Sequence, residues 1–139
     1  MPKSSVVRAR ELAAETQNSR CYYCGALMCV DELTAFASRH GLSVSAVRLL
    51  QCTAEHLIAK CDGGMDVADN IVAACHFCNS KRHARRKPLS PGAYQKYVQG
   101  RVHRRRWHPE PLWRAGLIVA EAGDGASQTP LKTPTQRHP

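Results

Sequence analysis

Residues 53–79 decide the fold of this chain and read TAEHLIAKCDGGMDVADNIVAACHFCN. Apolar and β-favouring residues at 51–59 predict one strand, and residues 70–74 predict a second. Between them, residues 60–69 contain two consecutive glycines and several aspartates, which is typical of a loop. The segment therefore predicts two antiparallel strands joined by a loop.

Helices are expected on both sides of these strands. A helix should begin at Cys75, run to about Arg86 or Lys87 and stop at Pro88, which cannot continue it. Further helices are predicted from apolar spacing and capping residues, at 4–17, 30–40, 43–50 and 90–106. The expected fold class is α+β, a small and mostly helical domain around a two-strand and one-helix core.

Two C-x₂-C pairs flank the decisive segment, Cys21 with Cys24 and Cys75 with Cys78. Each pair can present two thiolates from one turn of backbone, and two pairs complete a tetrahedral zinc site. A redox role would need a thioredoxin-like βαβ context, which this pattern lacks. Because a closed four-sulfur site has no open position, the predicted zinc is structural.

Three cysteines remain outside these pairs. Cys29 and Cys52 are expected to be small buried side chains, whereas Cys61 could be exposed and is the first candidate to intrude on the metal site. Seven cysteines are an odd number and do not suggest a disulfide framework. The beginning of the sequence lacks the apolar core of a signal peptide, so a reducing, cytoplasmic location is expected, in a bacterial or phage-infected cell.

A second group of polar residues lies between the cysteine pairs. Glu55 and His56 are adjacent on the first predicted strand, and Asn79 follows Cys78 at the start of the helix. Glu55 and Asn79 could hold a divalent cation, Mg²⁺ or Mn²⁺ by their oxygen ligands, with His56 taking a proton from water. Asn70 could fix the loop by bonding backbone groups, so that His56 keeps one orientation. This chemistry suits phosphodiester cleavage.

The order of these residues resembles the HNH nuclease family, through Glu55-His56, Gly63-Gly64, Asn70-Ile71-Val72, Cys75-x-x-Cys78-Asn79 and Lys81. The upstream C-x₂-C pair is similar to the zinc-stapled subgroup, which includes restriction-type and phage junction-resolving enzymes. The resemblance covers roughly residues 21–86 and implies the ββα-metal fold and a metal-dependent DNA endonuclease.

The resemblance also implies roles for single residues. Glu55 takes the position of a metal ligand that is usually Asp, His or Glu, and His56 that of the general base. Asn70 is the central structural asparagine, and Asn79 is the last metal ligand in the Asn-ending variant of the motif. His83 is an added ligand in related bacterial toxin nucleases; the alternative is that it faces DNA phosphate or solvent. Other divalent transition metals would also suit such a site.

The charge of the chain is divided at residue 80. Residues 1–80 carry 7 basic and 8 acidic side chains, whereas residues 81–139 carry 13 basic and 3 acidic ones. Such a basic half favours a polyanion, and the resemblance makes that partner DNA. A solvated helical face or a basic membrane helix are the alternatives, but acids are absent from 81–106 and the apolar face there is small. The predicted DNA contacts are Lys81, Arg82, Arg85, Arg86, Lys96, Arg101, Arg104, Arg105 and Arg106.

These patterns divide the chain into four parts. We expect an N-terminal helix at 1–20, the zinc-stapled nuclease core at 21–87, a basic helical extension at 88–121 and a disordered tail at 122–139. The competing functions are a non-catalytic zinc module that binds nucleic acid and a protein-interaction zinc domain. The first leaves the Glu55-His56 pair and Asn79 unexplained, and the second leaves the basic half unexplained. Double-strand cleavage by one such site would favour a homodimer.

Overall fold

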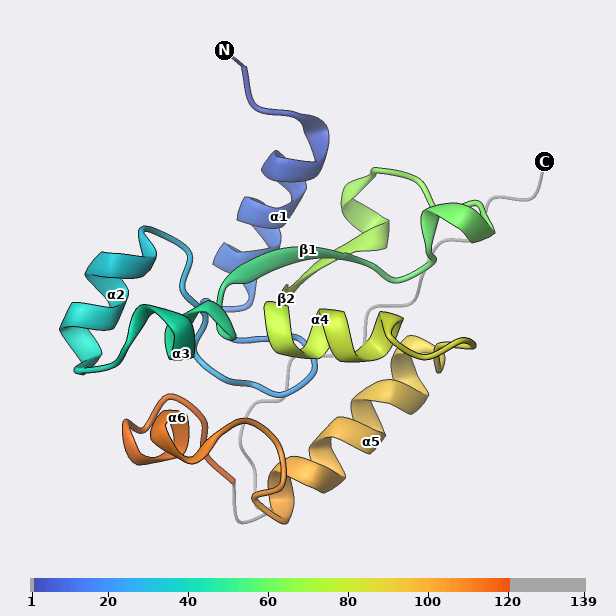
Figure 1. Ribbon diagram of the computed structural model, residues 1–139. Coiled ribbons are helices and arrows are strands. Elements are labelled where there is room, and N and C mark those ends of the chain that lie inside the picture. The colour runs from blue at the N-terminus through green and yellow to red at the C-terminus, as the bar shows by residue number, and fades with distance from the viewer. Residues whose placement is uncertain (1, 121–139) are drawn as a thin grey trace.

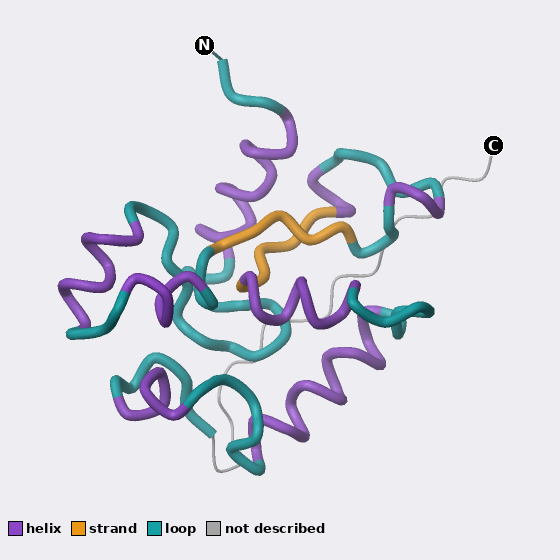
Figure 2. The backbone as a smooth tube through the Cα atoms, in the orientation of Figure 1, coloured by secondary structure: helices purple, strands orange, loops and turns teal. Residues whose placement is uncertain are grey.

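The computed structural model describes residues 2–120 of the 139-residue chain. The tail that we predicted to be disordered, at 122–139, lies outside the described residues. The elements follow in the order α1 (Ser5–Thr16), α2 (Leu33–His40), α3 (Val44–Arg48), β1 (Cys52–His56), β2 (Ile71–Cys75), α4 (His76–His83), α5 (Pro91–His103) and α6 (Glu110–Arg114). Two short 3-10 turns, Lys60–Asp62 and Ala68–Asn70, lie between the strands. The structure is therefore of the predicted mixed class, with helices around a small sheet (Figures 1 and 2).

The sheet consists of β1 and β2 alone within residues 2–120. The strands are antiparallel, and their register pairs Cys52 with Cys75 at one end and His56 with Ile71 at the other. Helix α1 packs on one side of this sheet and α4 on the other, with α5 beyond α4 (Figure 1). Together β1, β2 and α4 form the predicted two-strand and one-helix core.

Helix α1 fits closely against the sheet because its buried face is built from small side chains, Ala9, Ala13 and Ala14. Its N-cap is Ser4, whose hydroxyl accepts a hydrogen bond from the Val7 amide at 3.2 Å. Just beyond the helix, the buried Gln17 side chain donates to the Ala73 carbonyl at 2.8 Å and accepts from the Ala73 amide at 3.0 Å. Gln17 thus satisfies the outer backbone groups of β2 as a further strand would.

The first strand is shorter than predicted, ending at His56 rather than residue 59. The reason is Asn70, whose buried side chain accepts from the Ile58 amide at 2.8 Å and donates to the carbonyls of Ile58 and Met65, each at 3.0 Å. These bonds replace the strand ladder and fold the loop back on itself. Asn70 therefore occupies the loop-fixing place that was predicted for it.

Other boundaries differ at the helix ends. Helix α2 begins at Leu33 instead of residue 30, because Cys29 pairs with the backbone of Leu50 and Cys52. Helix α4 ends at His83, three residues short of the prediction. Helix α5 ends at His103, and the chain reverses through Arg105 with a left-handed φ of 53°. Contacts between distant segments and reversals of the backbone set these helix ends. The spacing of apolar residues in the sequence does not reveal either.

The C-terminal extension packs back onto the core. Trp107, Leu112, Trp113, Leu117 and Ile118 are all buried, and the Leu27 amide donates to the Leu117 carbonyl at 2.8 Å. These apolar residues therefore attach the extension to the rest of the domain. Among the described residues, none of the helices has the length and apolar character needed to span a bilayer.

Gly64 provides a test of the loop that connects the strands. A Cβ at this position would lie 1.7 Å from the carbonyl oxygen of Ile58, which is backbone and has no freedom to move aside. Gly64→Ala should therefore lower the free energy of unfolding by about 3 kcal/mol, as measured by urea denaturation.

The matched control is Gly92→Ala, where a Cβ meets nothing within 4 Å on the first turn of α5. This change should leave stability equal or raise it by about 0.5–1 kcal/mol, because alanine favours the helix. Equal stability of the two variants would contradict the close approach at Gly64.

Candidate functional site

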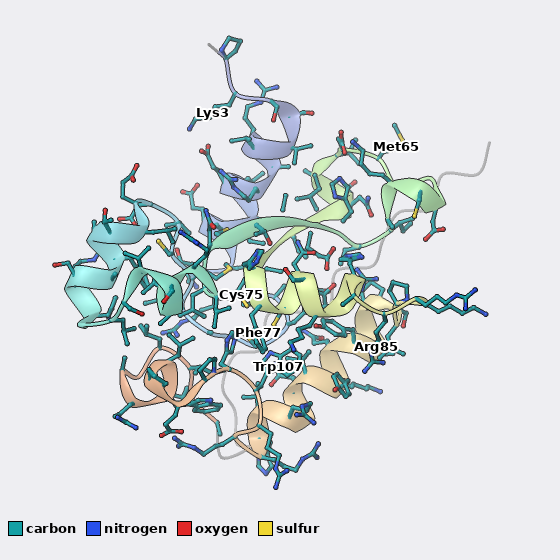
Figure 3. All side chains as sticks on the ribbon, in the orientation of Figure 1. Lys3, Met65, Cys75, Phe77, Arg85 and Trp107 are labelled. Carbon is teal, nitrogen blue, oxygen red and sulfur yellow. The ribbon has the colours of Figure 1, made fainter. Side chains whose placement is uncertain are left out.

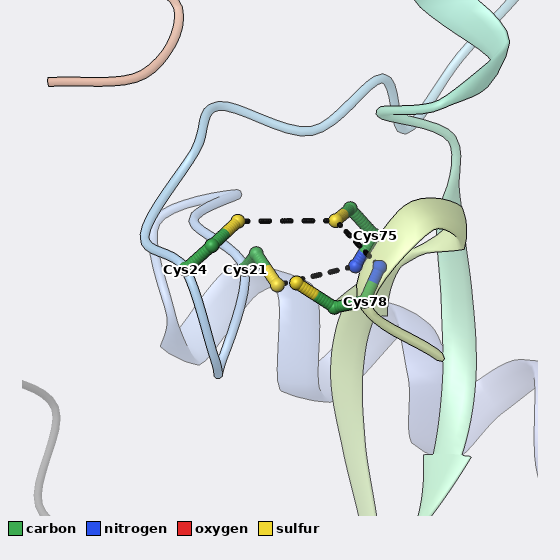
Figure 4. Close-up of side chains that lie close together, drawn as sticks. All are labelled: Cys21, Cys24, Cys75 and Cys78. Atoms are coloured by element: carbon green, nitrogen blue, oxygen red, sulfur yellow. Dashed lines mark hydrogen bonds between the residues drawn. The ribbon is translucent and has the colours of Figure 1, made fainter. Parts of the chain in front are cut away.

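Four buried cysteines gather where three segments of the fold meet (Figure 4). Cys21 and Cys24 lie in the loop after α1, Cys75 ends β2, and Cys78 is in the first turn of α4. Their sulfur atoms all lie within 4.8 Å of one another, and those of Cys24 and Cys75 are 3.8 Å apart. Zinc–sulfur bonds of about 2.3 Å in a tetrahedron place sulfurs about 3.8 Å apart. The cluster therefore has the composition and the spacing of a four-sulfur metal site.

Backbone amides point at these sulfurs. The Sγ atom of Cys21 accepts from the amides of Tyr23 at 3.4 Å and Cys75 at 3.3 Å, and the Sγ atom of Cys75 accepts from the Cys78 amide at 3.4 Å. Gly25, at a left-handed φ of 75°, closes the first turn by donating to the Cys21 carbonyl. Such N–H donors stabilise the thiolate form, which is the form that binds metal.

The four thiols differ in their acidity. Burial raises the pKa of Cys24, Cys75 and Cys78. Burial also opposes a charge on Cys21, but hydrogen bonds from the other three thiols outweigh it and hold the pKa of Cys21 well below its usual range. Burial thus opposes a charge on these thiols, and a bound divalent metal ion would favour the thiolate form of all four.

Two aromatic side chains from the C-terminal extension cover the sulfur cluster. The Trp107 indole donates to Cys78 Sγ at 3.3 Å, and His108 Nε2 lies 3.4 Å from Cys24 Sγ. Burial lowers the pKa of His108 to about 4, so the ring is neutral near pH 7. Sequence reasoning named Cys61 as an exposed residue and as the first candidate to intrude on this cluster. Its exposure is confirmed, but the second expectation is wrong, because Cys61 lies outside the cluster.

A second polar group lies between β1 and α4. Glu55 is 1% exposed; its Oε1 lies 2.9 Å from His83 Nε2, whereas its Oε2 is buried and accepts no hydrogen bond from residues 2–120. Asn79, one turn before His83, donates its amide to Thr53 Oγ1 at 3.0 Å and the Ala54 carbonyl at 3.4 Å. The structure thus brings together Glu55 and His83 and holds Asn79 against the strand beside them. Carboxylate, amide and imidazole atoms in this arrangement are suited to a divalent cation.

His56 is the last residue of β1, next to Glu55, and its ring contacts a separate set of polar side chains. Its Nε2 lies 2.8 Å from Asp66 Oδ1, and the Lys60 ammonium lies 3.0 Å from Asp66 Oδ2. Hydrogen bonds from His56 and Lys60 lower the pKa of Asp66, which keeps this carboxylate ionised. Sequence reasoning did not single out Asp66, because three aspartates in this loop have the same local signal.

The prediction for Arg82 requires correction. We expected it to contact DNA, but it is 5% exposed and its guanidinium is engaged inside the protein. It donates to the carbonyls of Leu89, His56 and Leu57, and lies 3.4 Å from Glu55 Oε2 in an ion pair. Arg82 is buried because it compensates the buried negative charge of Glu55. The spacing of residues in the sequence does not reveal that Glu55 is buried.

The remaining basic residues of the predicted interface lie at the surface, exposed or half-buried. Several rest on aromatic rings: Arg85 lies 4.8 Å from the centre of the Tyr97 ring and Arg105 lies 4.7 Å from that of Trp113 (Figure 3 labels Arg85). These rings limit the freedom of the long side chains while leaving their charge outward. The exposed or half-buried residues are Lys81, Arg85, Arg86, Lys96, Arg101, Arg104, Arg105 and Arg106.

The cysteine cluster predicts a defined metal content. The purified protein should contain about one zinc ion per chain by elemental analysis. Cys75→Ser should lose the metal and lower the melting temperature, because structural zinc contributes directly to folding. Cys61→Ser is the matched control, since Cys61 is exposed and outside the cluster. A folded Cys75→Ser protein with a full complement of zinc would refute the four-sulfur site.

The chain was compared with known proteins. No curated protein and no solved structure matches the chain. Residues 39–85 match the family of HNH endonucleases, a range that contains β1, β2, α4 and the second cysteine pair. The match supports a nuclease or nucleic-acid-related function. Through this segment the chain carries the HNH endonuclease motif, and its four clustered cysteines fit the zinc-stapled subgroup of that family.

Proposed function

We infer that the protein is a metal-dependent DNA endonuclease that hydrolyses phosphodiester bonds. The observation that carries this inference is Glu55, a buried carboxylate that lies 2.9 Å from His83 and has one oxygen without a hydrogen-bond partner among residues 2–120, on the strand against which Asn79 is held. Burial of a carboxylate is costly unless a cation or donors compensate it. Arg82 and His83 compensate part of this charge, and the place of Glu55 in a segment that matches the HNH endonucleases supports a catalytic cation as its further partner.

The donor set fits that cation. Glu55 would provide a carboxylate oxygen, Asn79 its carboxamide oxygen and His83 an imidazole nitrogen. Two oxygens and one nitrogen suit Mg²⁺, Mn²⁺ and other divalent transition metals. When bound, the cation supplies positive charge for the scissile phosphate and the leaving 3′ oxygen.

His56 is the proposed general base, oriented by Asp66. If His56 Nε2 carries the proton and donates it to Asp66 Oδ1 at 2.8 Å, Nδ1 keeps its lone pair. Nδ1 can then accept a proton from the attacking water. Arg82 and Asn70 support this geometry, because they bind the carbonyls of His56 and Ile58 on either side of Leu57. The backbone that carries the base is thus fixed from two directions.

The basic surface would hold the substrate. Lys81 and Arg85 lie on or just after α4, and the later arginines follow on the extension around α5. Phosphate contacts of this kind position DNA without reading its sequence. Because one site cuts one strand, double-strand cleavage would need a second copy, and we propose a homodimer for that reaction.

One observation favours the alternative, a non-catalytic zinc module that binds nucleic acid. Glu55 already has two cationic neighbours, Arg82 at 3.4 Å and His83 at 2.9 Å, so its burial has a structural explanation as well. The two functions differ in what they require of His56. A binding module needs no base at this position, whereas hydrolysis does.

Replacement of His56 separates these functions. The wild-type protein should nick or linearise supercoiled plasmid in the presence of Mg²⁺, Mn²⁺ or Ni²⁺. His56→Ala should cut at a rate about 10²- to 10⁴-fold lower, because it removes the general base, while binding to the same plasmid persists.

The control is His76→Ala, another histidine of the same unit, which is exposed and whose side chain bonds only Ser80 among the described contacts. It should retain wild-type cleavage. Cleavage by His56→Ala at the wild-type rate would exclude His56 as the base, and a wild-type protein that cuts neither duplex nor branched DNA with any of these metals would favour the binding module.

Asp66 gives a graded test of the same proposal. Asp66→Asn keeps the size of the side chain but loses the charge that orients His56, so kcat should fall about 10-fold or more with little change in KM. Asp66→Glu should restore part of the loss. The same change at Asp62, an exposed aspartate of this loop, should leave kcat unaltered.

A further inference from the structure

We propose that His108 belongs to the metal centre as an outer side chain that donates an Nε2–H hydrogen bond to the metal-bound thiolate of Cys24. Through this bond the C-terminal extension is fastened to the metal. The proposal does not depend on nuclease activity and concerns a residue outside the two cysteine pairs.

The contacts place His108 beside the sulfurs. Its Nε2 lies 3.4 Å from Cys24 Sγ and 3.8 Å from Cys75 Sγ, and the residue is only 9% exposed. The four sulfurs already provide a complete tetrahedral set, so the imidazole stands outside it. A divalent cation with four thiolates carries two negative charges, and a buried N–H donor next to one sulfur offsets part of that charge.

His108 adopts a strained backbone conformation that its surrounding contacts maintain. His108 has a left-handed φ of 66°, a conformation that a non-glycine residue adopts at a cost of roughly 1–3 kcal/mol. The carbonyl of Trp107 accepts from the Trp113 indole at 2.7 Å, and the His108 ring packs on Phe77 at 4.5 Å between centres. The surrounding contacts therefore fix a conformation that turns the ring toward the sulfurs.

The second ring nitrogen agrees with this protonation state. His108 Nδ1 is buried and has no hydrogen-bond partner within the described part of the chain, residues 2–120. With the proton on Nε2, Nδ1 is a bare lone pair, so no N–H donor is left buried and unpaired. The alternative tautomer would bury an unpaired N–H and turn a lone pair toward an anionic sulfur.

Trp107 makes a similar contact with another sulfur of the cluster. Its indole N–H donates to Cys78 Sγ at 3.3 Å, and its ring meets Phe77 edge-on at 4.8 Å between centres (Figure 3 labels Phe77 and Trp107). Two consecutive residues thus aim N–H groups at sulfurs from different C-x₂-C pairs. The metal centre therefore draws on a third segment of the chain, and metal binding should stabilise residues 107–118 together with the two cysteine turns.

X-ray absorption of the zinc-loaded full chain tests which role His108 has. We expect four sulfur neighbours and no nitrogen, for wild type and for His108→Gln. A zinc site with three sulfurs and one nitrogen in the wild type would overturn the proposal, since His108 would then be a direct ligand.

Zinc release to a chelator tests the hydrogen bond. His108→Ala should release zinc about tenfold faster than wild type, because it loses a donor to a ligand sulfur. His108→Gln, whose amide can still donate, should recover part of the difference. His103→Ala is the control, an exposed histidine of the same extension that should match wild type. Release from His108→Ala at the wild-type rate would also overturn the proposal.

A variant at Trp107 covers the case in which His108→Ala does not fold. Trp107→Phe keeps an aromatic ring but removes the N–H that bonds Cys78, so zinc release should again quicken. Hydrogen exchange of residues 107–118 should rise on zinc removal in the wild type. Exchange of this segment that does not respond to zinc would contradict its attachment to the metal centre.

Discussion

The packing of α4 against the sheet depends on the cluster of four cysteines. Cys75 closes β2 and Cys78 lies in the first turn of α4, so the two residues fix the angle at which the helix leaves the strand. The other pair comes from the loop after α1 and meets this junction at the sulfur cluster. Asn79 follows Cys78 directly and His83 lies one turn later, so a fixed helix start also fixes which side chains face β1. A sheet of two strands has little stability of its own, and a metal ion held by these four cysteines would stabilise it.

A second constraint is the buried charge of Glu55. A carboxylate that is 1% exposed requires compensation, and α4 provides it through Arg82 and His83. Arg82 also binds the carbonyls of His56 and Leu57, so one side chain both balances the charge of Glu55 and holds the backbone next to it. This double engagement explains why an arginine inside a run of surface basic residues is withdrawn from the surface. Under the proposed function, the charge that prepares the cation site is therefore stabilised by the same contacts that position the base.

Some of this could be predicted from the sequence and some could not, for physical reasons. Paired cysteines, the caps at Ser4, Ser43 and Ser90, and the loop-fixing Asn70 act over a few residues or have a fixed spacing, so the sequence pattern predicts them. Other contacts join residues that are far apart in the sequence, as for Asp66, Arg82 and His108. The sequence around each of these residues is typical of an ordinary loop or of an exposed helix surface. The early end of β1 has the same origin, since the side chain of a residue 12 positions later takes over its backbone bonds. Tertiary partners, and not local preference, decided each of these cases.

The basic half of the chain, which begins after residue 80, is attached to the cysteine cluster by specific contacts. The basic extension is not a loose arm, because the Tyr94 hydroxyl donates to the Cys78 carbonyl at 2.6 Å and the Trp107 indole donates to the Cys78 sulfur. One residue of the metal cluster is thus bound by both α5 and the segment after it. Phosphate-binding side chains on a flexible arm would raise affinity for DNA without placing a particular bond at the site. Arginines held on Tyr97 and Trp113, on elements fastened to Cys78, keep a fixed relation to Glu55 and His56. For the proposed reaction this fixed relation matters more than the net charge, because hydrolysis needs one phosphate in one place.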